Sequence, residues 1–251
     1  MAKIVLIHGW ALNSGVWDDF VSQILDHRPD LDVQCIDLPG YGYSVGMPGA
    51  DSIDAMAQYC LDEVEKPAIW IGWSLGGMVA MKAAMLLPSK VQAIQLISSS
   101  PKFVESDDWP DGADLATFEL FSQKLANDYQ RTLTMFLLMQ AGNSAGARVL
   151  ARAVHDSICQ RPSPSLETLS AGIQCLAETD LRSDLHKLKM PIHVVGGLRD
   201  RVAKPSSNVR LSSMLGARLV QLNSGHAPFM TEPDAVIANL LQLIERVSDE
   251  R

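Results

Sequence analysis

A strongly apolar segment at residues 68–73 runs into the pattern G-x-S-x-G, which centres on Ser74, and then into an alanine- and methionine-rich segment. The first segment is typical of a buried strand and the last of a helix. Gly72 and Gly76 flank the serine, where side chains would crowd a tight backbone. The five residues alone are also compatible with a simple glycine-rich turn. Because a strand precedes them and a helix follows, we predict a nucleophile elbow with Ser74 at its apex.

Strand and helix patterns alternate on both sides of this turn. We predict strands at residues 3–8, 33–37, 68–73 and 91–97, and helices at 17–27, 52–63 and 75–87. The alternation resumes with strands at 191–196 and 218–222, a helix at 205–215, and a final helix whose apolar face holds Val236, Ile237, Leu240, Leu241 and Ile244. Nearly continuous apolar strands separated by helices predict an α/β fold with a mostly parallel sheet covered on both faces.

The segment at residues 101–190 has a different character. It contains helical patterns, such as 115–125 and 131–140, and no convincing strand. We therefore expect a helical cap at 101–190, inserted into an α/β core formed by residues 1–100 and 191–251.

Composition and charge exclude several classes of function. A net charge of −8 argues against nucleic acid as a partner, because binding phosphates needs an excess of Lys and Arg. No apolar run is long enough to cross a bilayer and no secretory segment opens the chain, so we expect a cytoplasmic protein without membrane association. We further expect a monomer. The four cysteines lack C-x-x-C spacing, and we predict neither a metal site nor a cofactor.

A serine nucleophile needs a base to accept its proton, and His226 is our candidate for that base. It lies in a glycine-containing loop between the last predicted strand and the last helix, where open α/β sheets place reactive groups. A capping or surface-loop histidine is the alternative interpretation. His193 lies within a strand pattern and His186 in the polar end of the cap, so both are weaker candidates.

Asp200 is the candidate for the acid that orients this base. It follows the strand that ends near residue 196, and the resulting chain order of Ser, Asp and His is that of serine hydrolases with a nucleophile elbow. A loop aspartate is also a common turn or capping residue. The main competing position, the loop after Ile97, offers no acid before Glu105.

Two backbone N–H groups are predicted to bind the oxyanion, those of Leu75 and Trp10. Leu75 follows the serine, and Trp10 lies in the loop after the first strand. His8 in that loop has a plausible packing or hydrogen-bonding role, and we do not assign it to catalysis. The glycine-rich loop at 37–44 lacks the patterns of phosphate-binding loops, so we interpret it as structural turn chemistry.

Several segments together resemble the α/β-hydrolase superfamily along nearly the whole chain: HGW at 8–10, DLPGYGYS at 37–44, GWSLGG at 72–77, GLRD at 197–200 and GHAPF at 225–229. More narrowly, the chain resembles the family of pimeloyl-acyl-carrier-protein methyl ester carboxylesterases of biotin synthesis. That similarity is carried by HGWALN at 8–13, AIWIGWSLGG at 68–77, SSSP at 98–101, DDWP at 107–110 and QRTLTMFLLMQ at 130–140. The chain departs from relatives in that its first strand begins at Lys3, which shortens or removes their N-terminal hairpin.

The resemblance implies a carboxylesterase that removes a methyl group from pimeloyl-acyl-carrier protein and releases methanol. It implies Ser74, Asp200 and His226 as the catalytic triad and Trp10 and Leu75 at the oxyanion and substrate site. It further implies an acyl pocket lined by Phe136, Leu137, Leu138, Met139 and Gln140. A general short-acyl esterase, a thioesterase or a carbon–carbon hydrolase is the alternative within the same class, because a triad does not set the leaving group. A non-catalytic ligand-binding protein with this fold is the alternative from another class.

One stretch within the cap has a net charge opposite in sign to that of the whole chain. Residues 124–161 hold five basic and two acidic side chains, a net +3 in a chain of −8. Acyl-carrier proteins are acidic, so we interpret Arg131, Arg148 and Arg152 as a docking surface for the carrier. A solvated helix face is the alternative, just as core packing is the alternative for residues 136–139.

Overall fold

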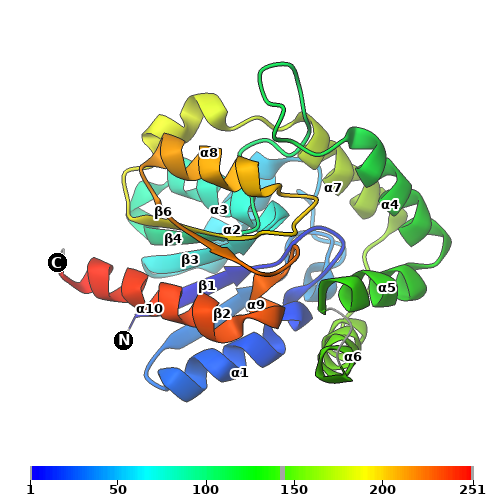
Figure 1. The fold of residues 1–251 in the computed structure, drawn as a ribbon, viewed down its shortest axis with the longest axis horizontal. Helices are drawn as coiled ribbons and strands as arrows, with labels where there is room; N and C mark the ends of the chain where they lie inside the picture. Colours follow the sequence, from blue (N-terminus) through cyan, green and yellow to red (C-terminus); the bar gives the residue numbers. More distant parts are fainter. Residues whose placement is uncertain (1, 142–144, 250–251) are drawn as a thin grey trace.

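The computed structural model describes residues 2–141 and 145–249, without the side chains of residues 140–148. One sheet of six strands forms its centre, in the order β2-β1-β3-β4-β5-β6, and every pair of neighbours is parallel (Figure 1). The strands are β1 (Lys3–Ile7), β2 (Asp32–Ile36), β3 (Ala68–Trp73), β4 (Val91–Ile97), β5 (Ile192–Gly197) and β6 (Arg218–Leu222). The predicted parallel sheet is confirmed.

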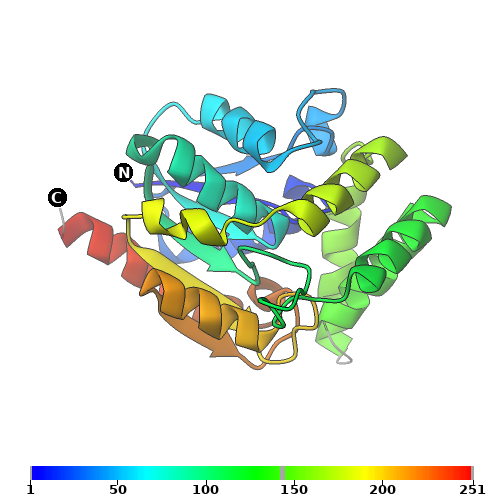
Figure 2. The same ribbon diagram turned by 90° about the horizontal axis from the view of Figure 1, so that it is seen from above.

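Helices cover both faces of this sheet. One face carries α1 (Asp18–His27), the short α9 (Pro228–Thr231) and α10 (Pro233–Asp249), and the other carries α2 (Ile53–Glu63), α3 (Leu75–Leu86) and α8 (Pro205–Leu215) (Figures 1 and 2). The hydroxyl of Ser52 accepts the Ala55 N–H at 3.1 Å and so begins α2. The bounds of α1, α2, α3 and α8 agree with the predicted ones to within a residue or two, α10 is the predicted final helix, and the short α9 was not predicted.

The strand β3, and β1 from Ile4 onward, are apolar at each position because both of their faces are buried. Along β1, Ile4 and Leu6 belong to one hydrophobic cluster and Val5 and Ile7 to the other. Successive side chains of a strand lie on opposite faces, so a strand between two helical layers has no position for a solvated residue. This arrangement explains why apolar runs rather than alternating patterns marked the strands in the sequence.

A helical insert separates β4 from β5 in the chain and lies beyond one end of the sheet (Figure 2). It contains α4 (Leu115–Asn127), α5 (Tyr129–Ala141), α6 (Ala145–Cys159) and α7 (Leu166–Glu178), followed by a 3-10 segment at Arg182–Lys187. The two helices predicted at 115–125 and 131–140 are α4 and α5, each longer than the pattern indicated. We refer to this insert as the cap.

The cap is anchored where the chain enters and leaves it. Two guanidinium groups lie over the buried ring of Trp109, with Arg182 at 5.3 Å and Arg210 at 4.7 Å from the ring centroid. Arg182 follows the cap helices, whereas Arg210 lies in α8 of the core. Cations over an indole face are favourable contacts, so this stack ties the loop before α4 to both parts of the protein.

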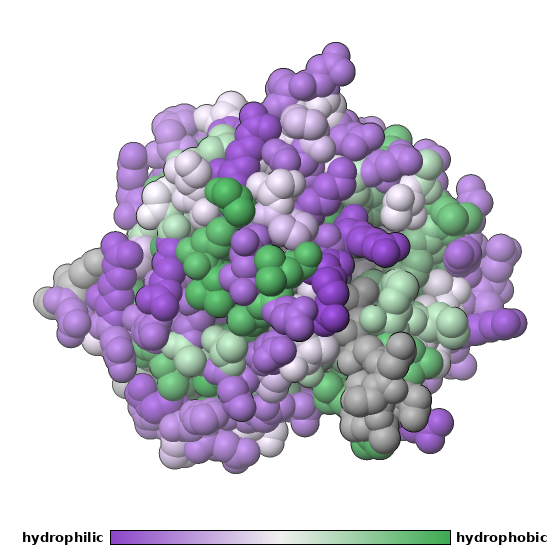
Figure 3. All heavy atoms as spheres, in the orientation of Figure 1, coloured by the Kyte–Doolittle hydropathy of each residue, from purple (hydrophilic) through white to green (hydrophobic). Residues whose placement is uncertain are grey.

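The surface in Figure 3 is mostly polar, with hydrophobic side chains gathered near the centre of the face in view. Within the described ranges, no helix combines the length and the hydrophobicity that crossing a bilayer requires.

Candidate active site

Ser74 lies between β3 and α3 in a backbone conformation that L-residues rarely adopt, with φ of +55°. The two neighbouring glycines make this turn possible. A Cβ atom on Gly72 would collide with the backbone of Gly76, and a Cβ on Gly76 would collide with the backbone carbonyl of Ile7. The local geometry is therefore the strand, tight turn and helix that the sequence predicted.

A continuous line of hydrogen bonds joins Ser74, His226 and Asp200. The Nε2 atom of His226 lies 3.0 Å from the Ser74 Oγ, and its Nδ1 atom lies 2.8 Å from Oδ2 of Asp200. All three residues are buried, with at most 7% of their surface exposed. The three side chains come from the loops after β3, β5 and β6, because the carboxyl ends of parallel strands meet at one edge of the sheet.

The second oxygen of Asp200 is also occupied. Its Oδ1 accepts the backbone N–H groups of Val202 at 2.8 Å and Ala203 at 3.1 Å. These bonds fix the plane of the carboxylate and aim Oδ2 at His226. With Nδ1 as the donor to Asp200, Nε2 is the imidazole atom that faces the Ser74 hydroxyl as an acceptor.

Trp73 supports the histidine in a way that the sequence did not reveal. Its indole Nε1 donates a 2.7 Å hydrogen bond to the backbone carbonyl of His226. The same indole packs edge-on against Phe229 and Trp17. The sequence identified Trp73 as an apolar strand residue, and no local signal links it to a loop 153 positions later.

Leu75 and Gly9, the residue before Trp10, lie beside the serine. Leu75 is the first residue of α3, and the N–H groups of a first helical turn have no carbonyl partner within the helix. Trp10 follows Gly9, where a Cβ atom would lie 3.2 Å from the Cβ of Ser74. The loop after β1 therefore runs directly along the nucleophile. A developing negative charge here would also meet the positive end of the α3 dipole.

His8 holds this loop in place through two hydrogen bonds. It is fully buried, and burial lowers the pKa of its imidazole, which favours the neutral ring. Its Nε2 accepts the Leu38 N–H at 3.0 Å, so the proton sits on Nδ1, which donates to the Gly9 carbonyl at 2.8 Å. The hydrogen-bonding role expected for His8 agrees with this geometry.

The residues implied to line an acyl pocket separate into different environments. Phe136 is half-buried and packs against Phe121, with ring centroids 5.4 Å apart, and Phe121 in turn packs edge-on against Trp10 at 5.6 Å. Leu137 is fully buried in a hydrophobic cluster that also includes side chains of α6. Met139 is 73% exposed, so we remove it from the pocket set.

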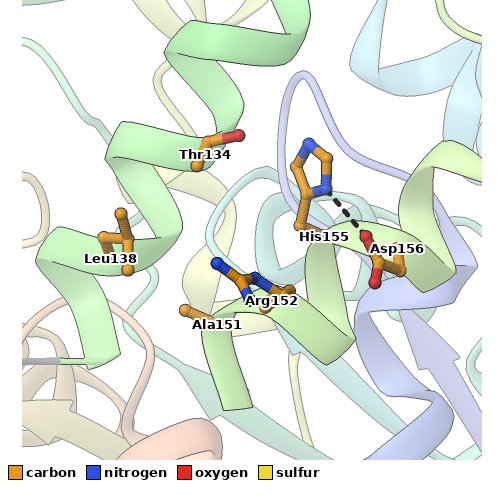
Figure 4. Close-up of a pocket in the computed structure, with 6 residues that line it drawn as sticks. All are labelled: Thr134, Leu138, Ala151, Arg152, His155 and Asp156. Atoms are coloured by element: carbon orange, nitrogen blue, oxygen red, sulfur yellow. Dashed lines mark hydrogen bonds and ion pairs between the residues drawn. The ribbon is translucent and has the colours of Figure 1, made fainter. Parts of the chain in front are cut away.

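Only part of the predicted docking surface lies in the described structure. Arg131 and Arg152 are exposed, in α5 and α6, whereas the side chain of Arg148 is outside the described residues. The side chain of Gln140, from the predicted acyl pocket, is also outside them. Arg152 borders a cleft of about 350 Å³ between α5 and α6 (Figure 4). The cleft is lined by Thr134, Leu138, Ala151, Arg152, His155 and Asp156, and it shares no residue with the line of hydrogen bonds at Ser74.

The weaker candidates for base and acid lie elsewhere. His193 is within β5 and bonds to Asn239 through Nδ1, and His186 bonds to the Ser183 carbonyl in the 3-10 segment. Glu105 pairs with Lys204 on the surface at 3.6 Å. Among the described residues, no group of three His, Cys, Asp or Glu side chains is arranged to hold a metal ion.

The chain matches the family model described as the alpha/beta hydrolase fold over residues 3–233. It belongs to the α/β-hydrolase family. This hydrolase is 39% identical, over 97% of its length and 94% of the relative's, to the pimeloyl-[acyl-carrier protein] methyl ester esterase of Klebsiella pneumoniae subsp. pneumoniae. A protein of the same name from Photobacterium profundum is 35% identical over 97% of this chain and 95% of the relative. The hydrolase is accordingly a carboxylic ester hydrolase.

Solved structures agree with the fold. An esterase from Exiguobacterium antarcticum superposes on this hydrolase with a TM-score of 0.84 at 21% identity, covering 98% of this chain and 92% of the other. An enol-lactonase from Burkholderia xenovorans gives a TM-score of 0.79 at 19% identity, covering 97% and 91%. At these identities the likeness concerns the arrangement of the backbone.

Proposed function

We propose that this hydrolase cleaves the methyl ester of a pimeloyl group carried on acyl-carrier protein and releases methanol, as a step of biotin synthesis. The hydrogen-bonded line from Asp200 through His226 to Ser74 carries the proposal of serine chemistry. The relatives named for this substrate at 35–39% identity support the choice of ester.

In the proposed reaction the Oγ of Ser74 attacks the ester carbonyl carbon while His226 Nε2 accepts the hydroxyl proton. The N–H groups of Leu75 and Trp10 stabilise the negative charge that develops on the carbonyl oxygen. Methanol leaves with the proton from His226, and an acyl-enzyme remains. Water, deprotonated by His226, then hydrolyses this ester and releases the free carboxylate. The triad uses no metal or organic cofactor in these steps.

We propose that residues 101–190 act as a cap over this site and supply its acyl-binding surface. Trp10, Phe121 and Phe136 form a row of packed aromatic rings between the oxyanion loop and the cap. Apolar rings of this kind suit the methylene chain of a pimeloyl group. We keep Phe136 in the proposed pocket. Leu137 is buried in the hydrophobic core beside it, and Leu138 lines the cleft between α5 and α6.

Methanol release tests the proposed function directly. The wild-type protein should release methanol from pimeloyl-carrier methyl ester with a higher kcat/KM than from the free monomethyl ester, because the carrier adds contacts with the cap. Headspace detection of methanol and mass spectrometry of the carrier measure both products. Cleavage of a simple aryl ester without methanol release from the carrier substrate would overturn the proposed substrate and favour the general esterase.

The proposed carrier surface predicts a charge-dependent loss of activity. Reversing Arg131 and Arg152 together to Glu should lower kcat/KM for the carrier-linked ester by at least about tenfold, or ~1.4 kcal/mol, and should reduce its salt dependence. Each single variant, Arg131→Glu or Arg152→Glu, is compared with Arg218→Glu as the matched control, because Arg218 is exposed and β6 begins at the end of the sheet away from Ser74. Equal losses on carrier-linked and free esters would contradict docking at these arginines.

A further inference from the structure

We propose that cap helix α7 positions the oxyanion loop through a latch formed by Trp10, Tyr41 and Gly172. The inference rests on the proposed function, because it assigns a purpose to the Trp10 backbone N–H at the reacting centre. Trp10 lies in the core loop after β1, yet its indole Nε1 donates a 3.0 Å hydrogen bond to the Leu169 carbonyl of α7. Its side chain is almost completely buried.

A second core loop rests on the same turn of α7. The hydroxyl of Tyr41 donates to the Thr168 carbonyl at 3.4 Å, and burial raises the pKa of Tyr41 above its ordinary value. Gly40, with φ of +83°, lies so close to Thr168 that a Cβ atom would be 2.7 Å from its Cγ2. The loops after β1 and β2 therefore meet the cap on successive residues, Thr168 and Leu169.

Gly172 provides the space into which both side chains fit. A Cβ atom on this residue would collide with Cδ1 of Trp10 and would lie 2.7 Å from its Nε1 and 2.6 Å from the Tyr41 hydroxyl. Glycine inside a helix is less favourable than alanine, so its presence here is explained by the two side chains that fill the site. The helix and the two loops are thus complementary in shape as well as hydrogen-bonded.

Contacts within the core complete the path from α7 to the reacting centre. The Tyr41 ring packs edge-on against His8 at 5.3 Å, and His8 joins the Leu38 N–H to the Gly9 carbonyl. Gly9 immediately precedes the Trp10 N–H. Ala11, the next residue, has a φ of +65°, a conformation that persists only where surrounding contacts hold it. The latch supplies such contacts on the side of the cap.

This arrangement predicts that a change in α7 will alter catalysis more than ground-state binding. An oxyanion donor acts mainly in the transition state, so its displacement lowers kcat with little change in KM. Removing a donor entirely costs about 10²–10³ in kcat, and shifting one costs less. We expect Gly172→Ala to lower kcat for p-nitrophenyl acetate by about tenfold with KM within about twofold. Ser170→Ala, an exposed position on the same helix, should leave both constants unchanged.

A double-mutant cycle shows whether the effect passes through Trp10. Trp10→Ala removes the Cδ1 and Nε1 atoms that the new methyl group would meet, so Gly172→Ala should cost much less in kcat in that background. The Trp10 indole N–H resonance, assigned by its absence in Trp10→Ala, should be protected from exchange in the wild type and exposed in Gly172→Ala. An unchanged kcat, an equal loss in both backgrounds, or an unprotected wild-type resonance would overturn the latch.

Two further measurements distinguish a failure of the latch from a failure of the proposed serine chemistry. If Gly172→Ala does not fold, as judged by thermal unfolding, Tyr41→Phe removes the hydroxyl alone and should lower kcat with KM unchanged. Unchanged kcat in Tyr41→Phe would then count against the latch. A wild-type protein that does not cleave p-nitrophenyl acetate would refute the proposed serine chemistry, and the protection of the Trp10 indole would still report the contact with α7.

Discussion

Replacing Ser74 by Ala should lower kcat for methanol release by about 10⁶, to the level of hydrolysis that binding and the oxyanion donors alone support. The substitution removes one oxygen, the atom that lies 3.0 Å from His226 Nε2. Without it no acyl-enzyme forms, and His226 can only direct water at the bound ester. The measurement compares single-turnover methanol release by the two proteins and searches for an acyl-enzyme by intact mass.

The fold of the Ser74→Ala variant should be unchanged, because alanine accepts the φ of +55° no worse than serine does. Thermal unfolding and far-UV circular dichroism check this point. A variant with the wild-type fold and a kcat within about 10² of wild type would exclude Ser74 as the nucleophile, given the far larger loss expected of one. The non-catalytic ligand-binding alternative would also gain support if the wild type itself released no methanol and formed no adduct with a fluorophosphonate.

The sheet and the elbow were predictable because their signals are local. A strand buried on both faces has to be apolar at successive positions, as in β1 and β3, and a turn as tight as that at Ser74 needs glycine beside it. The strand ends then place Asp200 and His226 at the same edge of the sheet as the serine. The topology of the sheet thus brings three loops that are distant in the sequence close together, although no sequence pattern links them directly.

The cap was predicted less completely because the composition of a helix does not say which of its faces is buried against the rest of the protein. Leu137 and Met139 are both apolar and only two residues apart, yet one is fully buried and the other is 73% exposed. Their positions around α5 differ by about 200°, so packing against neighbours decides between them. The apolar run at 136–139 indicated burial of some residues without identifying them.

Contacts between distant segments were the hardest to anticipate. Trp73 bonds to the backbone of His226, and Gly172 accommodates Trp10, across 153 and 162 positions respectively. A tryptophan in an apolar strand and a glycine in a helix each have an ordinary local explanation. Their contacts follow only from the folded structure, in which α7 meets the loop after β1 and the loop after β6 meets the end of β3.

Replacing Asp200 by Asn should lower kcat by about 10⁴ while leaving KM and the fold nearly unchanged. In the wild type the Oδ2 atom accepts from Nδ1 of His226 at 2.8 Å, which places the imidazole proton on the side away from Ser74. Asparagine retains an oxygen for the N–H groups of Val202 and Ala203, so its amide nitrogen faces His226 and donates to Nδ1. The proton then sits on Nε2, which can no longer accept one from the serine.

The control for this variant is Asp62→Asn, which makes the same chemical change at an exposed helix position and should leave kcat unaltered. Steady-state kinetics on an aryl ester measure all three proteins, so the result does not depend on the carrier. The ¹H–¹⁵N spectrum of the histidine side chains would show the tautomer of His226 directly. A loss below about tenfold, far short of the 10⁴ expected of an orienting acid, together with an unchanged tautomer would mean that Asp200 only braces the loop after β5. A changed tautomer with the full loss in kcat would establish that its carboxylate prepares His226 to act as the base.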